Sequence, residues 1–255
     1  MNKDLKEVVL ALSGGGARGA YHLGVLHYLD EHNIKVKAIC GTSIGSIIGA
    51  SYACGVSPKE QLELLKSKDV KKLFKFNWFK RSFFSIDMDA PVLKQMVPVA
   101  NIEDLNIPVY ITAFDLDEGK EVVFTQGDLH KTCQMSSALT PFFEPVIFKN
   151  TTYIDGGLIN HIPFAPLLGS NIPIIGVNLH PFIKNSIKHT LLSYVKRTLV
   201  ARMLKNIESA KKHSAYFIES PELVNYSILS LKNLDELFTL GYEAARQTLE
   251  QLDQN

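Results

Sequence analysis

Cysteine is scarce in this chain of 255 residues, and the positions of its three cysteines argue against two kinds of site. Cys40, Cys54 and Cys133 lack the close spacing by which metal-binding cysteines are recognised. An odd number of cysteines does not suit a disulfide framework and favours a reducing compartment. We therefore expect free thiols and no cysteine-based metal site.

The sequence also lacks an excess of charge of one sign. It has 27 lysine and arginine residues against 26 aspartate and glutamate residues, which leaves a net charge of +1. A domain dedicated to binding nucleic acid would carry a clear basic excess, so this class of function is not expected. The 46% of hydrophobic residues and 21% of charged residues are ordinary for a folded chain and exclude wholesale disorder.

An uninterrupted apolar helix long enough to cross a membrane is missing as well. The longest uncharged stretches, residues 38–58 and 156–183, are long enough to span a bilayer. The first is rich in glycine and serine, and the second contains four prolines, so their broken backbones would leave polar groups unpaired in lipid. The first residues, MNKDLKE, lead into an apolar strand without a signal-peptide core, and we expect a cytoplasmic location.

The apolar pattern at the start of the chain predicts alternating strands and helices. Residues 7–12 (EVVLAL) are typical of a buried strand, and a helical pattern follows from Arg18 to about Glu31. Residues 36–40 predict a second strand, which leads through a glycine-rich turn into a helix ending near Cys54. Such repeated strand–helix units imply parallel strands in one sheet.

Later segments extend this architecture within a single expected domain, residues 1–255. Further strands are predicted at residues 109–114, 121–124, 152–154 and 172–179, with a hairpin turn at residues 115–120. Long helices are predicted at residues 187–214 and 235–252. The motifs described below lie in a core of about residues 6–180, and the C-terminal helices occupy about residues 187–252.

The first chemical motif is a G-x-S-x-G sequence between a predicted strand and a predicted helix, formed by Gly41, Thr42, Ser43, Ile44 and Gly45. Glycines on both sides of a serine let the backbone turn sharply and expose the hydroxyl as a nucleophile. The N–H groups at the start of the following helix favour negative charge near that hydroxyl. The alternative is a glycine-rich turn in which the serine only caps the helix.

The second motif, residues 14–19 (GGGARG), first suggests a nucleotide-binding loop. It matches G-x-G-x-x-G between a strand and a helix, as a Rossmann-type fold requires. That fold also needs an acidic residue about 20 positions later, at the end of the second strand. The second predicted strand ends in Cys40 instead, which counts against nucleotide binding.

The same motif has a second interpretation as an oxyanion hole. Successive N–H groups of Gly14, Gly15 and Gly16 would form an anion-binding loop. Parallel neighbouring strands would place this loop and Ser43 at the same end of the sheet. Arg18 would either add positive charge there or anchor the loop.

A nucleophilic serine needs a base, and the best candidate is Asp155. It is followed by Gly156 and Gly157, directly after the strand predicted at residues 152–154. A turn aspartate that only accepts backbone hydrogen bonds is the alternative. Histidine is the usual base, and five histidines are candidates: His22, His130, His161, His180 and His213. His161 is kept as an auxiliary residue because it follows Asp155 closely, whereas His22 and His213 fall on predicted helices.

Basic residues are concentrated in two segments. The segment from Lys66 to Phe84 has seven basic residues against Asp69 and contains six aromatic residues. The segment from Lys184 to His213 has eight basic residues against Glu208. Basic residues beside aromatic ones suit contact with anionic lipid headgroups. The alternative is a helical lid with a buried aromatic face and solvated lysines.

In this order, the motifs resemble the patatin-like phospholipase family of serine acyl hydrolases. The resemblance covers about residues 6–180 and is carried by GGGARG at residues 14–19, GTSIG at 41–45 and DGG at 155–157. Residues 136–143 (SSALTPFF) are similar to the family stretch before the strand of the catalytic aspartate. Asn160 and Pro163 also match, whereas His161 stands where the family often has a second asparagine.

The resemblance implies a three-layer α/β/α sandwich on a mainly parallel sheet and a dyad of Ser43 and Asp155, with no catalytic histidine, metal or cofactor. Ser43 would attack an ester carbonyl, Asp155 would act as general base, and the N–H groups of Gly14 to Gly16 would hold the oxyanion. The supporting residues of the motifs are Arg18, Gly19, Gly41, Gly45, Gly156 and Gly157. The implied substrate is a phospholipid or another acyl ester, cleaved by a phospholipase A, lysophospholipase or carboxylesterase.

Other functions stay open at this point. An α/β-hydrolase triad would need His161, His180 or His213 after the serine and the aspartate, but Ser43 follows the second predicted strand, which is early for that fold. A regulator that binds lipid or acyl groups without turnover would keep the same pocket. A Rossmann-type nucleotide-binding protein is the remaining alternative.

Overall fold

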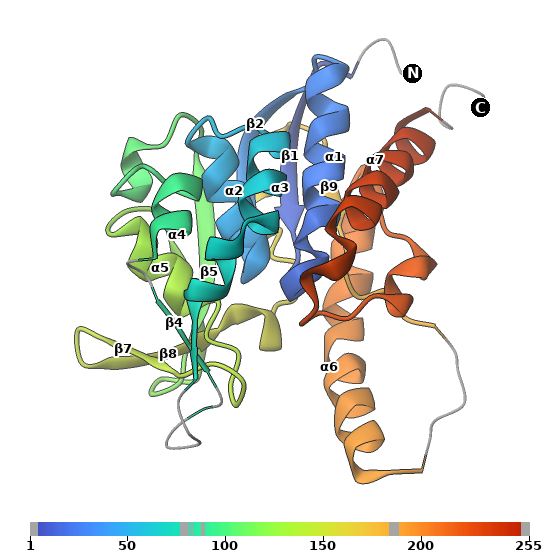
Figure 1. Cartoon of the computed structure of the whole chain (residues 1–255). Coiled ribbons are helices and arrows are strands. Elements are labelled where there is room, and N and C mark those ends of the chain that lie inside the picture. Colours follow the sequence, from blue (N-terminus) through green and yellow to red (C-terminus); the bar gives the residue numbers. More distant parts are fainter. Residues whose placement is uncertain (1–4, 77–81, 83, 88–89, 184–188, 251–255) are drawn as a thin grey trace.

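The computed structural model describes residues 5–76, 82, 84–87, 90–183 and 189–250 (Figure 1). They form a central sheet with helices on both faces, so the predicted three-layer α/β/α architecture is confirmed. The helices are α1 (Ala20–Glu31), α2 (Ile44–Ala53), α3 (Pro58–Lys66), α4 (Pro91–Met96), α5 (Leu129–Ser136), α6 (Leu191–His213) and α7 (Leu234–Glu250).

The sheet is mainly parallel. Its parallel strands are β1 (Glu7–Leu12), β2 (Lys35–Thr42), β5 (Val109–Asp115), β9 (Ile174–Val177) and β10 (Tyr216–Ile218). Antiparallel strands are β6 (Lys120–Phe124), β7 (Val146–Phe148) and β8 (Thr151–Asp155). The strand order is β10–β9–β1–β2–β5–β8–β7, and β6 pairs with β5 outside this order.

The central strands are apolar on both faces because both faces are covered. In β1, Leu10 packs in the larger hydrophobic cluster together with Tyr21 of α1. Its neighbour Val9 points to the other face and packs in a second cluster that includes Ile207 of α6. A continuous apolar run such as EVVLAL is therefore what a parallel strand between two helical layers requires.

Helices α1 and α7 pack closely on one face of the sheet, and two glycines make this contact feasible. A Cβ atom on Gly24 would clash with the backbone oxygen of Phe238, and one on Gly241 would clash with that of Tyr21. The C-terminal helix is thus fitted to the helix that follows the glycine-rich loop.

Several predicted boundaries differ from the structure. The helical pattern from Arg18 begins as a 3-10 helix (Gly16–Gly19) before α1. Helix α6 begins at Leu191 rather than at residue 187, which lies outside the described residues. Strands β7 and β10 were not predicted, because three-residue strands are too short to show an alternating pattern.

The basic and aromatic segment between α3 and α4 is not a helical lid where the structure describes it. Residues Lys68–Leu73 form a 3-10 helix, and β3 (Phe74–Phe76) pairs antiparallel with β4 (Phe84–Ile86). The remaining residues of this segment, 77–81 and 83, lie outside the described part of the chain. Aromatic residues alternating with lysine or serine in this hairpin account for the absence of a helical period.

Candidate active site

The predicted nucleophile, Ser43, lies in a sharp turn between β2 and α2. Its backbone φ of 52° and ψ of −128° are uncommon for a residue with a side chain. A Cβ atom on Gly41 would lie 2.7 Å from the carbonyl carbon of Gly45, and one on Gly45 would lie 2.5 Å from the backbone oxygen of Leu12. The two motif glycines therefore let the start of α2 approach the ends of β1 and β2.

Two buried hydroxyl groups hold the peptide groups on either side of this residue. The N–H of Ser43 donates to Oγ of Ser136 at 2.8 Å, and Oγ of Ser46 donates to the carbonyl oxygen of Ser43 at 2.6 Å. The side chain of Ser43 makes no capping hydrogen bond to α2. The alternative of a serine that only caps the helix therefore does not fit the geometry.

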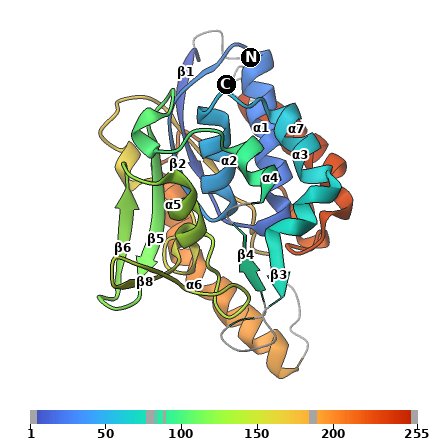
Figure 2. The same cartoon turned by 60° about the vertical axis from the view of Figure 1, so that its left-hand side comes forward.

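The predicted base, Asp155, is brought beside Ser43 by strand β5. Strand β2 pairs with the first half of β5 and ends at Thr42, which lies opposite Thr112. Strand β8 then pairs with the second half of β5, with Asp155 opposite Ala113. Because β6 occupies the other edge of β5 (Figure 2), β2 and β8 share one edge, and Asp155 comes directly beyond the end of β2.

The carboxyl group of Asp155 is buried, with 3% of the residue exposed. Burial raises its pKa to about 6, although the neighbouring hydroxyl groups of Ser43 and Thr42 and the N–H of Gly157 oppose this shift. The Gly157 bond to Oδ1 measures 2.7 Å. Asp155 thus accepts the backbone bond expected of a turn aspartate and also faces the hydroxyl of Ser43.

A short segment at the end of α5 connects the backbones of the two residues. Oγ of Ser136 accepts from the N–H of Ser43, and the carbonyl oxygen of Ala138 accepts from the N–H of Asp155 at 3.1 Å. Both linking residues are buried. The sequence marked this segment by its similarity to a family stretch, but it gave no role to Ser136 or Ala138.

The glycine-rich loop lies next to the predicted nucleophile, at the same end of the sheet. A Cβ atom on Gly14 would lie 3.2 Å from Cβ of Ser43. Gly16 has a φ of 56°, and a Cβ there would clash with the backbone oxygen of Ile228, so glycine is required. None of the hydrogen bonds among the described residues uses an N–H of Gly14, Gly15 or Gly16 as donor. The use of these N–H groups as an oxyanion hole stays a prediction.

Arg18 anchors this loop. Its Nε and Nη2 donate to the carbonyl oxygen of Tyr226 at 2.9 and 2.8 Å, and its Nη1 donates to that of Leu179 at 2.8 Å. The guanidinium thereby ties the loop to the segments after β9 and before α7. The sequence left two roles open for Arg18, adding positive charge or anchoring the loop, and these hydrogen bonds match the anchoring role.

The remaining motif glycines lie at close contacts. A Cβ on Gly19 would clash with Ile44 of α2, and one on Gly156 would lie 2.9 Å from the backbone oxygen of Thr112. A Cβ on Gly157 would lie 3.0 Å from Oδ1 of Asp155. These glycines allow the loop, the turn and the base to approach one another.

Three of the candidate histidines have lowered pKa values and lie near the glycine-rich loop. His22 is fully buried, and its Nε2 is 2.9 Å from the carbonyl oxygen of Ser13. The rings of His161 and His180 meet edge to face, with 4.8 Å between their centroids. Burial lowers the pKa of His22 and His180 to about 4 and lowers that of His161 well below its usual value.

The other two candidate histidines have structural contacts. Nε2 of His130 is 2.8 Å from the carbonyl oxygen of Val97, and the His213 ring stacks on Phe164. Within the described part of the chain, no hydrogen bond joins a histidine to Ser43 or Asp155. The arrangement thus fits a serine and an aspartate better than a triad with histidine.

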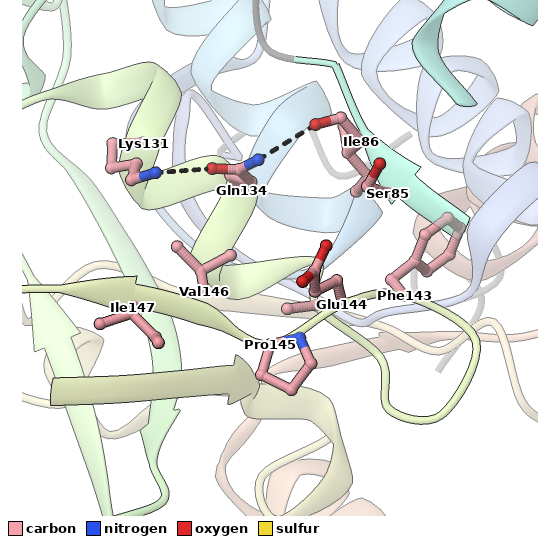
Figure 3. A pocket seen from close by; sticks show the side chains of 10 residues that line it. Ser85, Ile86, Lys131, Gln134, Phe143, Glu144, Pro145, Val146 and Ile147 are labelled. Atoms are coloured by element: carbon pink, nitrogen blue, oxygen red, sulfur yellow. Dashed lines mark hydrogen bonds between the residues drawn. The ribbon is translucent and has the colours of Figure 1, made fainter. Parts of the chain in front are cut away.

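A pocket of about 220 Å³ lies between β4, α5 and β7 (Figure 3). On its α5 side, Lys131 donates to Gln134 at 3.0 Å, and Gln134 donates to the carbonyl oxygen of Ile86 at 3.0 Å. Ala138, which accepts the N–H of Asp155, also lines it. A ligand here would contact the segment that connects the predicted base and nucleophile.

The described residues offer neither a cluster of metal-binding side chains nor a membrane-spanning helix. Among the residues that the structure describes, no three His, Cys, Asp or Glu side chains are grouped so that they could bind a metal ion. Of the helices within the described ranges, none is both long and apolar enough to traverse a bilayer.

Comparison with known sequences gives one family match. The family model described as patatin-like phospholipase matches residues 10–168. An uncharacterized NTE family protein of Mycobacterium tuberculosis is 30% identical over 176 residues, which are 68% of this chain and 49% of that protein. Lysophospholipase NTE1 of Mycosarcoma maydis is 23% identical over 282 residues, covering 96% of this chain but 15% of its own length. The chain thus spans half or less of these relatives.

Solved structures share the fold. VipD from Legionella pneumophila superimposes with a TM-score of 0.64 at 11% identity, over 97% of this chain and 67% of that one. The type III effector protein ExoU superimposes with a TM-score of 0.53 at 15% identity, over 98% of this chain and 54% of that one. At these identities the likeness concerns the fold alone.

Proposed function

The chain belongs to the patatin-like phospholipase family, and from this premise we propose that it is a serine hydrolase that cleaves acyl esters of lipids. The observation that carries the proposal is the meeting of Ser43, in its strained turn, with the buried carboxyl group of Asp155. A pKa of about 6 leaves this carboxyl mostly ionised at neutral pH and still basic enough to accept a proton.

The first half of the proposed reaction forms an acyl-enzyme. Oγ of Ser43 attacks the ester carbonyl carbon while its proton passes to the carboxylate of Asp155. The carbonyl electron pair moves to oxygen, and the resulting oxyanion accepts hydrogen bonds from the N–H groups of Gly14, Gly15 and Gly16. When the intermediate collapses, the ester bond breaks and the departing alcohol takes the proton from Asp155.

The second half returns the enzyme to its starting state. Asp155 accepts a proton from a water molecule as the water oxygen attacks the acyl carbon. The second oxyanion is held by the same loop, and its collapse releases the fatty acid and returns the proton to Ser43. Each proton moves between one carboxyl group and one oxygen at a time, so these steps do not require histidine.

The proposed substrate is a phospholipid or lysophospholipid, with a simple carboxylic ester as a weaker substrate. One relative named above is a lysophospholipase, which supports a lipid ester as substrate. Contact of the segment from Lys66 to Phe84 with anionic lipid also stays a proposal, since part of that segment lies outside the described residues. The cytoplasmic location expected from the sequence likewise stays a prediction.

The decisive experiment is labelling with a fluorophosphonate probe, which reacts with activated serines. We expect the wild type to be labelled, Ser43→Ala to be unlabelled, and Asp155→Asn to be labelled far more slowly. Ser170→Ala is the matched control, because Ser170 lies at an exposed position and should leave labelling unchanged. A folded wild-type protein that does not react with the probe would contradict the proposal.

A regulator that binds lipid without turnover is the second candidate function, because it would keep the same pocket. It differs in one measurable respect: it would bind fatty acid while releasing none from any acyl ester. Hydrolysis of a series of p-nitrophenyl esters of increasing chain length separates the two functions, with Ser43→Ala as the blank.

A further inference from the structure

Helix α6 consists of two halves with different surroundings. Its C-terminal half packs on the sheet: Ile207 and Ala210 are buried, and the side chain of Asn206 accepts from the N–H of Ile162 at 2.8 Å. In its first half, the side chains that the structure describes from residue 191 to 202 are all exposed or partly exposed. Both views show this half extending beyond the body of the protein (Figure 1, Figure 2).

Large apolar side chains are exposed at the tip of this projection. Leu191 is 81% exposed, Tyr194 is 47% exposed, and Phe182, just before the helix, is 44% exposed. The guanidinium of Arg197 lies 4.2 Å from the centre of the Phe182 ring and donates to the carbonyl oxygen of Ile183 at 3.3 Å. These contacts attach the Phe182 segment to the first half of α6, which also carries Leu191 and Tyr194.

The helix is also strongly basic. Its sequence has one acidic residue, Glu208, against six basic residues: Lys196, Arg197, Arg202, Lys205, Lys211 and Lys212. Among the α6 cations whose side chains the structure describes, Lys211 has an ion pair, at 3.7 Å from Glu219. Arg202 and Lys205 are exposed. Positive charge is thus exposed at the end of the first half, at Arg202, and just beyond it, at Lys205.

The projection points away from the body at the end of the sheet that holds the candidate site. Strands β1 and β2 run toward this end and lead there into the Gly14 loop and Ser43. The hairpin of β7 and β8 lies at the same end, with Ile147 exposed (Figure 1). A flat surface that touched the tip of α6 would therefore lie across the end at which Ser43 is found.

We propose that the first half of α6, with Phe182, docks the protein on a membrane surface that contains anionic lipid. Helices that lie at such surfaces combine exposed apolar side chains with basic ones, and each cation gains from the negative surface potential. A second copy of the chain is a poorer occupant, because two helices of this charge repel each other. The proposal rests on the proposed function, since a lipid hydrolase must reach its substrate at a membrane.

The test is co-sedimentation with vesicles of phosphatidylcholine containing about 30% phosphatidylglycerol. We expect Arg202→Glu combined with Lys205→Glu to weaken vesicle binding by at least about 25-fold, or about fivefold for each cation. Leu191→Ser combined with Tyr194→Ser should weaken it by about tenfold through loss of apolar contact. Binding of the wild type should fall as salt is raised and should be weak on pure phosphatidylcholine.

The matched control is Lys35→Glu combined with Lys37→Glu, which makes the same change in net charge. Both lysines are exposed at the start of β2, at the opposite end of the sheet. The proposal is overturned if this control loses as much binding as the α6 variant, because net charge alone would then explain the effect. It is also overturned if the wild type does not bind these vesicles, or if the α6 variants bind as the wild type does.

A second readout separates this proposal from the proposed function. Hydrolysis of soluble p-nitrophenyl butyrate should be the same in the wild type and in both α6 variants, because none of the changed residues lies at Ser43 or Asp155. Absence of ester hydrolysis with intact vesicle binding would contradict the enzyme and leave the docking surface standing. Sedimentation velocity tests whether a second copy of the chain binds at this surface instead. If the wild type is a dimer and the Leu191→Ser, Tyr194→Ser variant is a monomer, the surface is a dimer interface and the docking proposal is overturned.

Discussion

The residues around Ser43 in the candidate active site and those in the first half of α6 differ in the exposure of their side chains. In the candidate active site, the hydroxyls of Ser46 and Ser136 are buried, and each forms a hydrogen bond with the backbone of Ser43. On α6, Leu191 and Tyr194 expose apolar surface to the surroundings. The first region thus fixes the position of Ser43 through buried hydrogen bonds, whereas the second leaves apolar surface uncovered.

Replacement of the predicted base, Asp155, is the strongest test of the candidate active site. We expect Asp155→Asn to lower kcat on a soluble ester by about a thousandfold or more, because an amide cannot accept the proton of Ser43. The measurement is initial rate at saturating ester, with circular dichroism to show that the variant is folded. A loss of less than about tenfold would mean that another group acts as base.

The link through α5 can be tested with two neighbouring serines. Ser136→Ala should lower kcat by about 10- to 100-fold with little change in KM, because the buried N–H of Ser43 loses its partner. Ser137→Ala is the matched control, since Oγ of Ser137 is buried without a hydrogen-bond partner. Equal effects of the two substitutions would show that the bond to Ser43 has no special part in the rate.

The pKa of Asp155 gives a prediction for the pH dependence of the rate. Only the ionised carboxyl can act as base, so kcat/KM should rise about tenfold per pH unit and level off above about pH 6. The measurement is the rate on a soluble ester between about pH 4 and about pH 8, roughly the range in which such a domain stays folded. A midpoint near the ordinary value of an aspartate would show that burial does not govern this group.

The raised pKa of Asp155 also predicts how this residue affects the stability of the fold at different pH values. The folded state raises the pKa of Asp155 above its unfolded value, so its contribution favours folding at low pH and is lost as pH rises through about 6. Asp155→Asn should therefore raise the free energy of unfolding at about pH 8, by up to about 3 kcal/mol, and have little effect at about pH 4. Urea unfolding at the two pH values checks this. A variant destabilised equally at both would indicate lost packing instead.

The smallest expected effect lies on the exposed half of α6. Leu191→Ala should change the free energy of unfolding by less than about 0.5 kcal/mol, as is usual for an exposed side chain. Ile207→Ala, in the buried half of the same helix, should cost about 2 to 4 kcal/mol. Thermal unfolding of the two variants provides the comparison, and similar losses would show that the first half of α6 is packed after all.

The sequence was most informative where structure depends on neighbours in the chain. The run EVVLAL and the glycines around Ser43 predict β1 and the turn correctly, because an apolar run and the spacing of glycines can be recognised within a few neighbouring residues. The joining of β2 and β8 along one edge of β5 was not predictable, because strand register is set by distant segments. The role of Ser136 was missed for the same reason: its partner, Ser43, lies far away in the sequence.

The shared edge of β5 also bears on the order of events during synthesis. A chain that has emerged only as far as α2 already contains the nucleophile, but its carboxylate partner is still to be made. Asp155 is placed beside Ser43 by the pairing of β8 with β5, which joins distant segments, and pairings of that kind are generally slow to form. On the proposed mechanism, Ser43 therefore gains its base only when the sheet is complete.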